Sequence, residues 1–183
     1  MDKANNVVSI VDLDAGREVA QVPTGKNPHE VAVSPNGRSA VVSNYGSQEP
    51  GNSLSVIDVV NKKNTKTIDL RDYKRPHGLE FINDNEVLVT SEATKTLLKV
   101  NIKSGKIVEI AKTEQVTSHM VAYSKSDQRA YVANIKDGTV SVINVAANKF
   151  LNQIYLKPGI EGIDVSPDGK ELWVANSIGG RKR

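Results

Sequence analysis

Short runs of alternating apolar and polar residues follow one another along the whole chain, separated by turn residues. Typical runs are 8–12, 41–44 and 139–144, and the turns between runs include Asn36-Gly37 and Asp137-Gly138. A period of two, with Val and Ile more frequent than Leu, predicts β-strands rather than helices. Asn-Gly and Asp-Gly pairs are typical of tight hairpin turns. The pattern therefore predicts an all-β fold of short antiparallel strands.

The runs also recur with a long period. Each repeat starts with a similar segment, found at residues 28–37, 76–81, 118–124 and 161–169. A second apolar run in each repeat ends in a small polar residue, at Asn44, Ser91, Asn134 and Asn176, about 42 to 47 residues apart. Two further runs complete the unit. Four short strands in roughly 40 to 45 residues are the pattern of a β-propeller blade.

The repeats predict a single β-propeller domain, or a fragment of one, over residues 1–183. Complete four-stranded antiparallel blades are expected at about 29–70, 77–111 and 119–156, with half-blades at about 6–22 and 161–176. The chain thus holds about four blades' worth of strands. The two half-blades are complementary, so their pairing would close a four-bladed ring. We favour the alternative, an open arc or a piece of a longer propeller, whose exposed edges would also allow an edge-to-edge homodimer.

Three motifs give the repeats a family resemblance. They are Pro-His-Glu-Val-Ala-Val-Ser-Pro-Asn-Gly at 28–37, Tyr-Val-Ala-Asn at 131–134 and Gly-Thr-Val-Ser-Val-Ile-Asn at 138–144. With them the chain resembles the YVTN-repeat β-propellers (WD40/YVTN repeat-like), which are similar to lactonase-like and quinoprotein amine dehydrogenase-like seven-bladed propellers. The resemblance covers about residues 6–177. It implies a propeller fold, a role as a binding scaffold or a lactonase, and a location that is often secreted or periplasmic in similar proteins.

All three histidines of the chain occupy the same repeat position, at the start of the predicted innermost strand. They are His29, His77 and His119, and Glu161 takes that position in the fourth repeat. Imidazole and carboxylate groups that converge on a propeller axis suit Zn²⁺ or non-haem iron, so all four residues are candidate ligand-binding and metal-binding groups. The placement is similar to that in carotenoid oxygenases, whose iron is held by histidines from successive blades.

A structural role for these histidines is the interpretation that we favour. By parity His29 shares a strand face with Val31 and Val33, and that face is expected to point between blades. Each imidazole would then contact a neighbouring blade and bind no ligand. The metal site and the structural role both stay open at this point.

Basic residues gather in the loops expected on the histidine-bearing face. The longest irregular insertion, 45–52, and the long interblade loop 71–76 are predicted to lie there. The basic residues of the interblade loops are Lys26, Arg71, Lys74, Arg75, Lys112 and Lys157. They favour a small anionic molecule or a protein as the partner, with Lys26 and Arg75 as candidate contacts. A solvated rim of mixed charge is the simpler alternative.

Composition excludes several classes of protein. The chain has 183 residues, a net charge of +3 and no cysteine, which rules out disulfides and thiolate sites. Basic residues are spread along the chain with few aromatics among them, which argues against nucleic-acid binding. No apolar run reaches the roughly 20 residues of a membrane span, and residues 1–20 show no signal peptide. None of this fixes the compartment.

The expected function is a binding scaffold that presents its loop-rich face to a small anionic ligand or to a protein. The alternative is a lactonase-like hydrolase in which His77, His119 or Glu161 acts as the general base. Arg75 or a divalent metal would polarise the lactone carbonyl in that case. The sequence contains no nucleophile elbow, P-loop, dinucleotide fingerprint or H-E-x-x-H motif.

Overall fold

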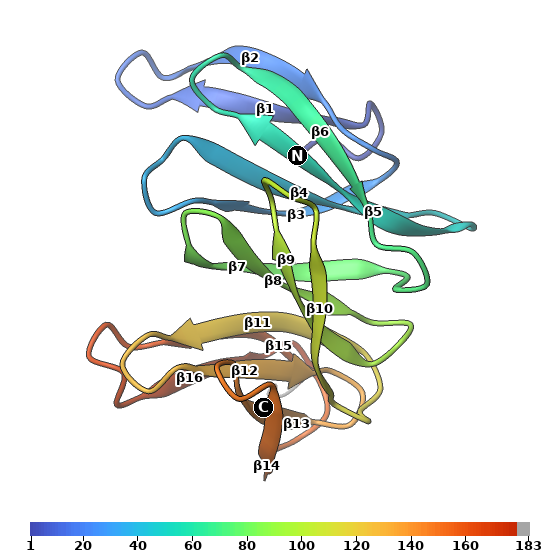
Figure 1. The fold of residues 1–183 in the computed structure, drawn as a ribbon, viewed down its shortest axis with the longest axis vertical. Helices are drawn as coiled ribbons and strands as arrows, with labels where there is room; N and C mark the ends of the chain where they lie inside the picture. Colours follow the sequence, from blue (N-terminus) through green and yellow to red (C-terminus); the bar gives the residue numbers. More distant parts are fainter. Residues whose placement is uncertain (179–183) are drawn as a thin grey trace, which may run out of the picture.

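The computed structural model describes residues 1–178, which consist of strands and turns arranged in five sheets (Figure 1). The amino-terminal sheet pairs β1 (Val7–Asp12) with β2 (Arg17–Pro23). The first complete sheet has the order β3 (Pro28–Val33), β4 (Ser39–Gly46), β5 (Pro50–Asp58) and β6 (Lys63–Asp69). The second has β7 (Pro76–Asn83), β8 (Glu86–Ser91), β9 (Thr96–Asn101) and β10 (Ile107–Lys112). The third has β11 (Ser118–Ser124), β12 (Arg129–Asn134), β13 (Thr139–Asn144) and β14 (Lys149–Tyr155). The carboxyl-terminal sheet pairs β15 (Ile160–Val165) with β16 (Leu172–Asn176).

All paired strands within these sheets are antiparallel, and each strand pairs with its neighbours in sequence. The prediction of an all-β fold with three four-stranded blades and two half-blades is therefore confirmed. Residues 179–183 of the predicted domain lie outside the described range. Between residues 1 and 178 there is no helix long and apolar enough to cross a membrane.

The hydrophobic core lies between successive sheets. Leu54 and Ile68 of the first complete sheet pack in one cluster with Leu79 and Val89 of the second. A second cluster joins the second and third complete sheets, and smaller clusters attach each two-stranded sheet to its neighbour. The β-branched side chains of the alternating runs fill these spaces face to face. This packing sets the innermost strands β3, β7, β11 and β15 side by side.

The arc of sheets is open. β1 and β2 lie at one end of the molecule and β15 and β16 toward the other, and the two pairs belong to separate sheets (Figure 1). The two half-blades do not pair, so the closed four-bladed ring is not formed.

The insertion at 45–52 is more regular than the sequence suggested. β4 continues to Gly46 and β5 begins at Pro50, and the ladder between them reaches the pair Gly46 and Pro50. Only residues 47–49 remain as the turn. The expectation of a long irregular loop is wrong here, because the polar residues of this segment extend the hairpin beyond the neighbouring blades.

Candidate functional site

The three complete sheets and the carboxyl-terminal sheet all enter their innermost strand through a residue with positive φ. These residues are Asn27 (52°), Arg75 (57°), Thr117 (62°) and Gly159 (98°), each directly before the strand. The left-handed backbone turns the interblade connection into the strand in the same sense each time. As a result, the residues just after these turns occupy equivalent places in neighbouring sheets, and those residues include the three histidines.

A β-bulge interrupts each innermost strand at the histidine position. In β3 the register shifts between Pro28 and Val31, and β7, β11 and β15 shift at the equivalent place. A bulge adds one residue to the strand, so alternation on one side of it does not predict the face on the other side. The argument that placed His29 on the face of Val31 and Val33 fails for this reason.

The three imidazoles form a stack of tilted rings across three sheets, with interplanar angles of 48° between His29 and His77 and 37° between His77 and His119. The ring centroid of His77 lies 4.1 Å from that of His29 and 3.6 Å from that of His119. His77, in the middle, is only 2% exposed. Neither of its ring nitrogens has a hydrogen-bond partner among the described residues. The structure thus brings together the three histidines that the sequence singled out.

Glu92 and Tyr45 complete this group, and the sequence reasoning missed both. Oε1 of Glu92 lies 2.7 Å from Nδ1 of His119, and the Tyr45 hydroxyl donates a 2.6 Å hydrogen bond to Oε2 of Glu92. The Tyr45 ring also contacts His29 and His77. We call these five residues the histidine cluster. Tyr45 and Glu92 directly follow Asn44 and Ser91, so comparison of equivalent repeat positions would have revealed them.

Two further carboxylates lie at the edge of the cluster. Oε1 of Glu161 lies 3.9 Å from Nε2 of His119, and Oε1 of Glu30 lies 3.5 Å from Nδ1 of His29. The side chain of Glu161 is 53% exposed, whereas that of Glu92 is only 11% exposed. Glu161 is therefore near the histidines as expected, but as an exposed neighbour rather than a fourth member of the stack.

Arg75 contacts the cluster through Tyr45. Its guanidinium carbon lies 4.7 Å from the centroid of the Tyr45 ring, and Nη2 donates a 2.7 Å hydrogen bond to the carbonyl oxygen of Ser47. Lys26 is exposed, and its carbonyl oxygen accepts a hydrogen bond from the amide of Gly46. These contacts place Arg75 as a support for the aromatic ring. The other basic loop residues are exposed or partly exposed.

Burial controls the charge of the cluster. Loss of water, followed by the neighbouring His119, His29 and Lys3, together lower the pKa of His77 to about 2. Burial and then Lys3 lower the pKa of His29 as well. Burial and the hydrogen bond to Glu92 raise the pKa of Tyr45 to about 12. At neutral pH the cluster therefore contains a neutral His77 and a neutral Tyr45 beside the carboxyl group of Glu92.

The backbones of β7 and β11 lie close together beside the rings of His77 and His119. The amide of Gly78 donates a 2.8 Å hydrogen bond to Oγ1 of Thr90, and that hydroxyl donates a 2.6 Å bond to the carbonyl oxygen of His119. A Cβ at position 78 would lie 2.5 Å from the same carbonyl oxygen. Only glycine lets the two backbones come this close.

A carboxyl group further along β7 is expected to destabilise the fold at high pH. Burial, and then the charge of Asp164, raise the pKa of Glu80 to about 7 from an ordinary 4.5. Below about pH 4.5 Glu80 is protonated in both folded and unfolded chains, so it has no effect. As pH rises to 7 the unfolded chain loses the proton first, and the fold becomes less stable.

The Glu80→Gln variant should therefore be more stable than the wild type at pH 8. We expect its free energy of unfolding to be higher by on the order of 1 kcal/mol or more at pH 8, with no difference at pH 4. Urea denaturation at both pH values, with the exposed Glu18→Gln as control, checks this, and a pH-independent difference would contradict it.

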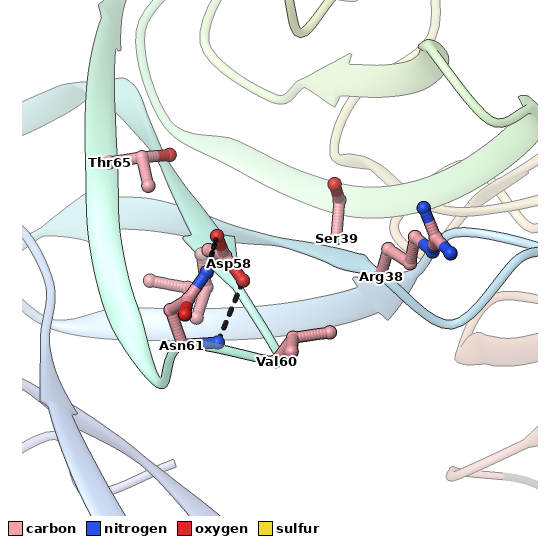
Figure 2. A pocket seen from close by; sticks show the side chains of 7 residues that line it. Arg38, Ser39, Asp58, Val60, Asn61 and Thr65 are labelled. Atoms are coloured by element: carbon pink, nitrogen blue, oxygen red, sulfur yellow. Dashed lines mark hydrogen bonds between the residues drawn. The ribbon is translucent and has the colours of Figure 1, made fainter.

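A separate hollow of about 520 Å³ lies at the other end of the first complete sheet (Figure 2). It is lined by Arg38, Ser39, Ile57, Asp58, Val60, Asn61 and Thr65. The Asp58 carboxylate in it already accepts hydrogen bonds from the amide and the side chain of Asn61, which lower its pKa. The Asp58 carboxylate is therefore already hydrogen-bonded within the chain.

In comparisons with known proteins, no family model and no curated protein matches the chain. The propeller-like architecture rests on the repeated four-stranded sheets themselves. The functional argument rests on the histidine cluster.

Proposed function

We propose that the chain is a YVTN-type binding scaffold and that its small-ligand site is the histidine cluster. One observation carries this proposal: the ring of His77 is buried between two other imidazoles, and neither of its nitrogens has a hydrogen-bond partner within residues 1–178. A buried polar group without a partner costs roughly 1 to 3 kcal/mol. A histidine with a purely structural role would normally be hydrogen-bonded, so the unused nitrogens favour a ligand.

The charges around the cluster favour a cation over a directly bound anion. Glu30, Glu92 and Glu161 each have a carboxylate oxygen within 3.9 Å of a histidine ring nitrogen. The sequence suggested a small anionic ligand because of the basic interblade loops. Arg75, the nearest of those candidates, already supports the Tyr45 ring and bonds Ser47. An anion would therefore need a bound cation between itself and the carboxylates.

Nuclear magnetic resonance of the three histidine rings tests the proposal. We expect at least one of four probes, Zn²⁺, acetate, inorganic phosphate or a library of small neutral molecules, to shift the ring signals saturably. Glu92→Gln should weaken that response, because it removes the charge beside His119 and keeps the shape. The exposed Glu18→Gln should respond like the wild type. No response to any of the four probes would contradict the proposal.

A lactonase-like hydrolase is the second candidate, favoured by the contact between Glu92 and His119. A carboxylate 2.7 Å from one imidazole nitrogen leaves the other nitrogen to take a proton, as in a general base. His119 would then activate water toward a lactone carbonyl. Under this hypothesis His119→Ala lowers the rate of lactone hydrolysis by about 10² to 10⁴, whereas His29→Ala has a much smaller effect. The absence of hydrolysis by the wild type would exclude it.

A further inference from the structure

We infer that His77, Glu92 and His119 bind a first-row divalent transition metal ion such as Zn²⁺. This inference rests on the proposed function, since it names the ligand of the same site. One potential ligand atom from each of the three residues lies within 4.8 Å of the others. In tetrahedral zinc sites with bond lengths of 2.0–2.1 Å, ligand atoms are roughly 3.3 Å apart. Binding would require side-chain rotations that bring the three ligand atoms together and move apart the rings of His77 and His119, whose centroids are 3.6 Å apart.

The residue types suit such an ion. Neutral imidazole and carboxylate are preferred ligands of zinc and of related divalent ions. His77 is 2% exposed and, in the part of the chain that the structure describes, has no hydrogen-bond partner to give up, so one of its nitrogens can donate a lone pair directly. The side chains of His119 and Glu92 are only 12% and 11% exposed. The site is thus largely shielded from water before an ion arrives.

Metal binding would replace a hydrogen bond by two metal–ligand bonds. Nδ1 of His119 and Oε1 of Glu92 lie 2.7 Å apart. If the metal takes the place between them, both atoms become ligands, and a neutral His119 ring then carries its proton on Nε2. The Tyr45 hydroxyl still donates to Oε2 of Glu92 and holds the carboxylate in orientation. Such outer-shell bonds commonly change metal affinity by about 10- to 100-fold.

Three protein ligands leave one position of a tetrahedral ion open. A water molecule or a small anion can occupy that position, as in zinc sites that act on substrates. A bound cation also neutralises the surrounding carboxylates. It would therefore give the basic, loop-rich face a way to hold the small anionic molecule expected from the sequence.

A second group of potential ligands, His29, Glu30 and His77, shares one residue with the proposed site. It is less suitable for a cation. The side chains of His29 and Glu30 are 26% and 32% exposed, so water competes with them for a cation. The pair of Glu92 and His119 is more deeply buried and is buttressed by Tyr45, so we assign the ion to that side of His77.

Zinc titration calorimetry on protein first dialysed against a chelator tests the inference. We expect one Zn²⁺ per chain, with an affinity reduced at least tenfold in Glu92→Gln and about tenfold in Tyr45→Phe. The matched control Glu30→Gln should stay within about threefold of the wild type. Circular dichroism and urea denaturation establish that each variant is folded. Co²⁺ bound in place of Zn²⁺ should give the strong visible absorption of a four-coordinate ion, and Glu92→Gln should abolish that band.

Three results would overturn the inference: no zinc binding by the wild type, equal affinity in Glu92→Gln and wild type, or a larger loss in Glu30→Gln than in Glu92→Gln. None of these results by itself contradicts the proposed function. If acetate, phosphate or a neutral molecule shifts the signals of the histidine rings while Zn²⁺ does not bind, the proposed ligand site is supported and the proposed metal is excluded. If no probe shifts the ring signals, both proposals are wrong.

Discussion

Replacing Gly78 with alanine should destabilise the fold by about 3 kcal/mol, at the upper end of the usual cost of overpacking. The new Cβ would lie 2.5 Å from the carbonyl oxygen of His119 and 2.9 Å from Cα of Met120. Both atoms belong to the backbone of β11, which cannot rotate out of the way as a side chain can. The steric clash is relieved only if β7 and β11 separate. That separation would break the bonds of the Thr90 hydroxyl to both strands and loosen the stack of His77 on His119.

Gly162 provides a matched control for this substitution. It follows Glu161 as Gly78 follows His77, so it occupies the equivalent repeat position. A Cβ there would meet only the side-chain carbon of Ala175, at 3.3 Å. We expect Gly162→Ala to cost less than about 1 kcal/mol in urea denaturation. Equal effects of the two substitutions would contradict a specific close approach at Gly78.

Acidification in chelator-containing buffer should destabilise the fold through His77. The pKa of His77 is lowered to about 2 by burial and by the neighbouring His119, His29 and Lys3. In the unfolded chain the ordinary value near 6.5 applies. Above pH 6.5 the ring is neutral in both states. Below it the unfolded chain takes up a proton that the folded chain does not, so stability falls by about 1 kcal/mol per pH unit.

Glu80 acts in the opposite direction over part of this range, so the wild-type curve alone does not isolate His77. The difference in free energy of unfolding between wild type and His77→Leu does isolate it. This difference should shift by about 2 kcal/mol in favour of His77→Leu as pH falls from 7 to 5. The partly exposed His29 offers the comparison, because its side chain is 26% exposed and His29→Leu should show a smaller shift. A difference that is flat with pH for His77→Leu would show that its ring is not buried in a neutral state.

The repeat pattern of the sequence predicted most of the fold. The alternation of Val140, Ser141 and Val142 predicted a strand, and β13 covers Thr139–Asn144, of which residues 139–143 are buried. Turn pairs such as Asp137-Gly138 supply the positive φ that the hairpins need. These signals are local, so they are readable from the chain. Whether the half-blades meet depends on the spacing of whole sheets, which no local pattern encodes.

The candidate site was only partly predictable, for physical reasons visible in particular residues. The shared repeat position of the three histidines predicted that they would converge, and their rings do stack. The face that they occupy was mispredicted, because a bulge at Pro28–Val31 breaks the alternation. Glu92 lies 27 residues before its partner His119. Such a contact depends on two sheets packing together, and only the equivalence of Glu92 with Tyr45 hinted at it.

The ionisation of His77 tests the central claim most directly, because that ring is 2% exposed and its nitrogens have no hydrogen-bond partner among the residues described. Nuclear magnetic resonance of isotopically labelled protein, in the presence of a chelator, follows each of the three histidine rings as pH is lowered from 9 to 5. We predict that the His77 signals keep the shifts of a neutral ring throughout, since its pKa is about 2. A His77 ring that titrates near the ordinary value of about 6.5 would contradict the buried stack and the site built on it.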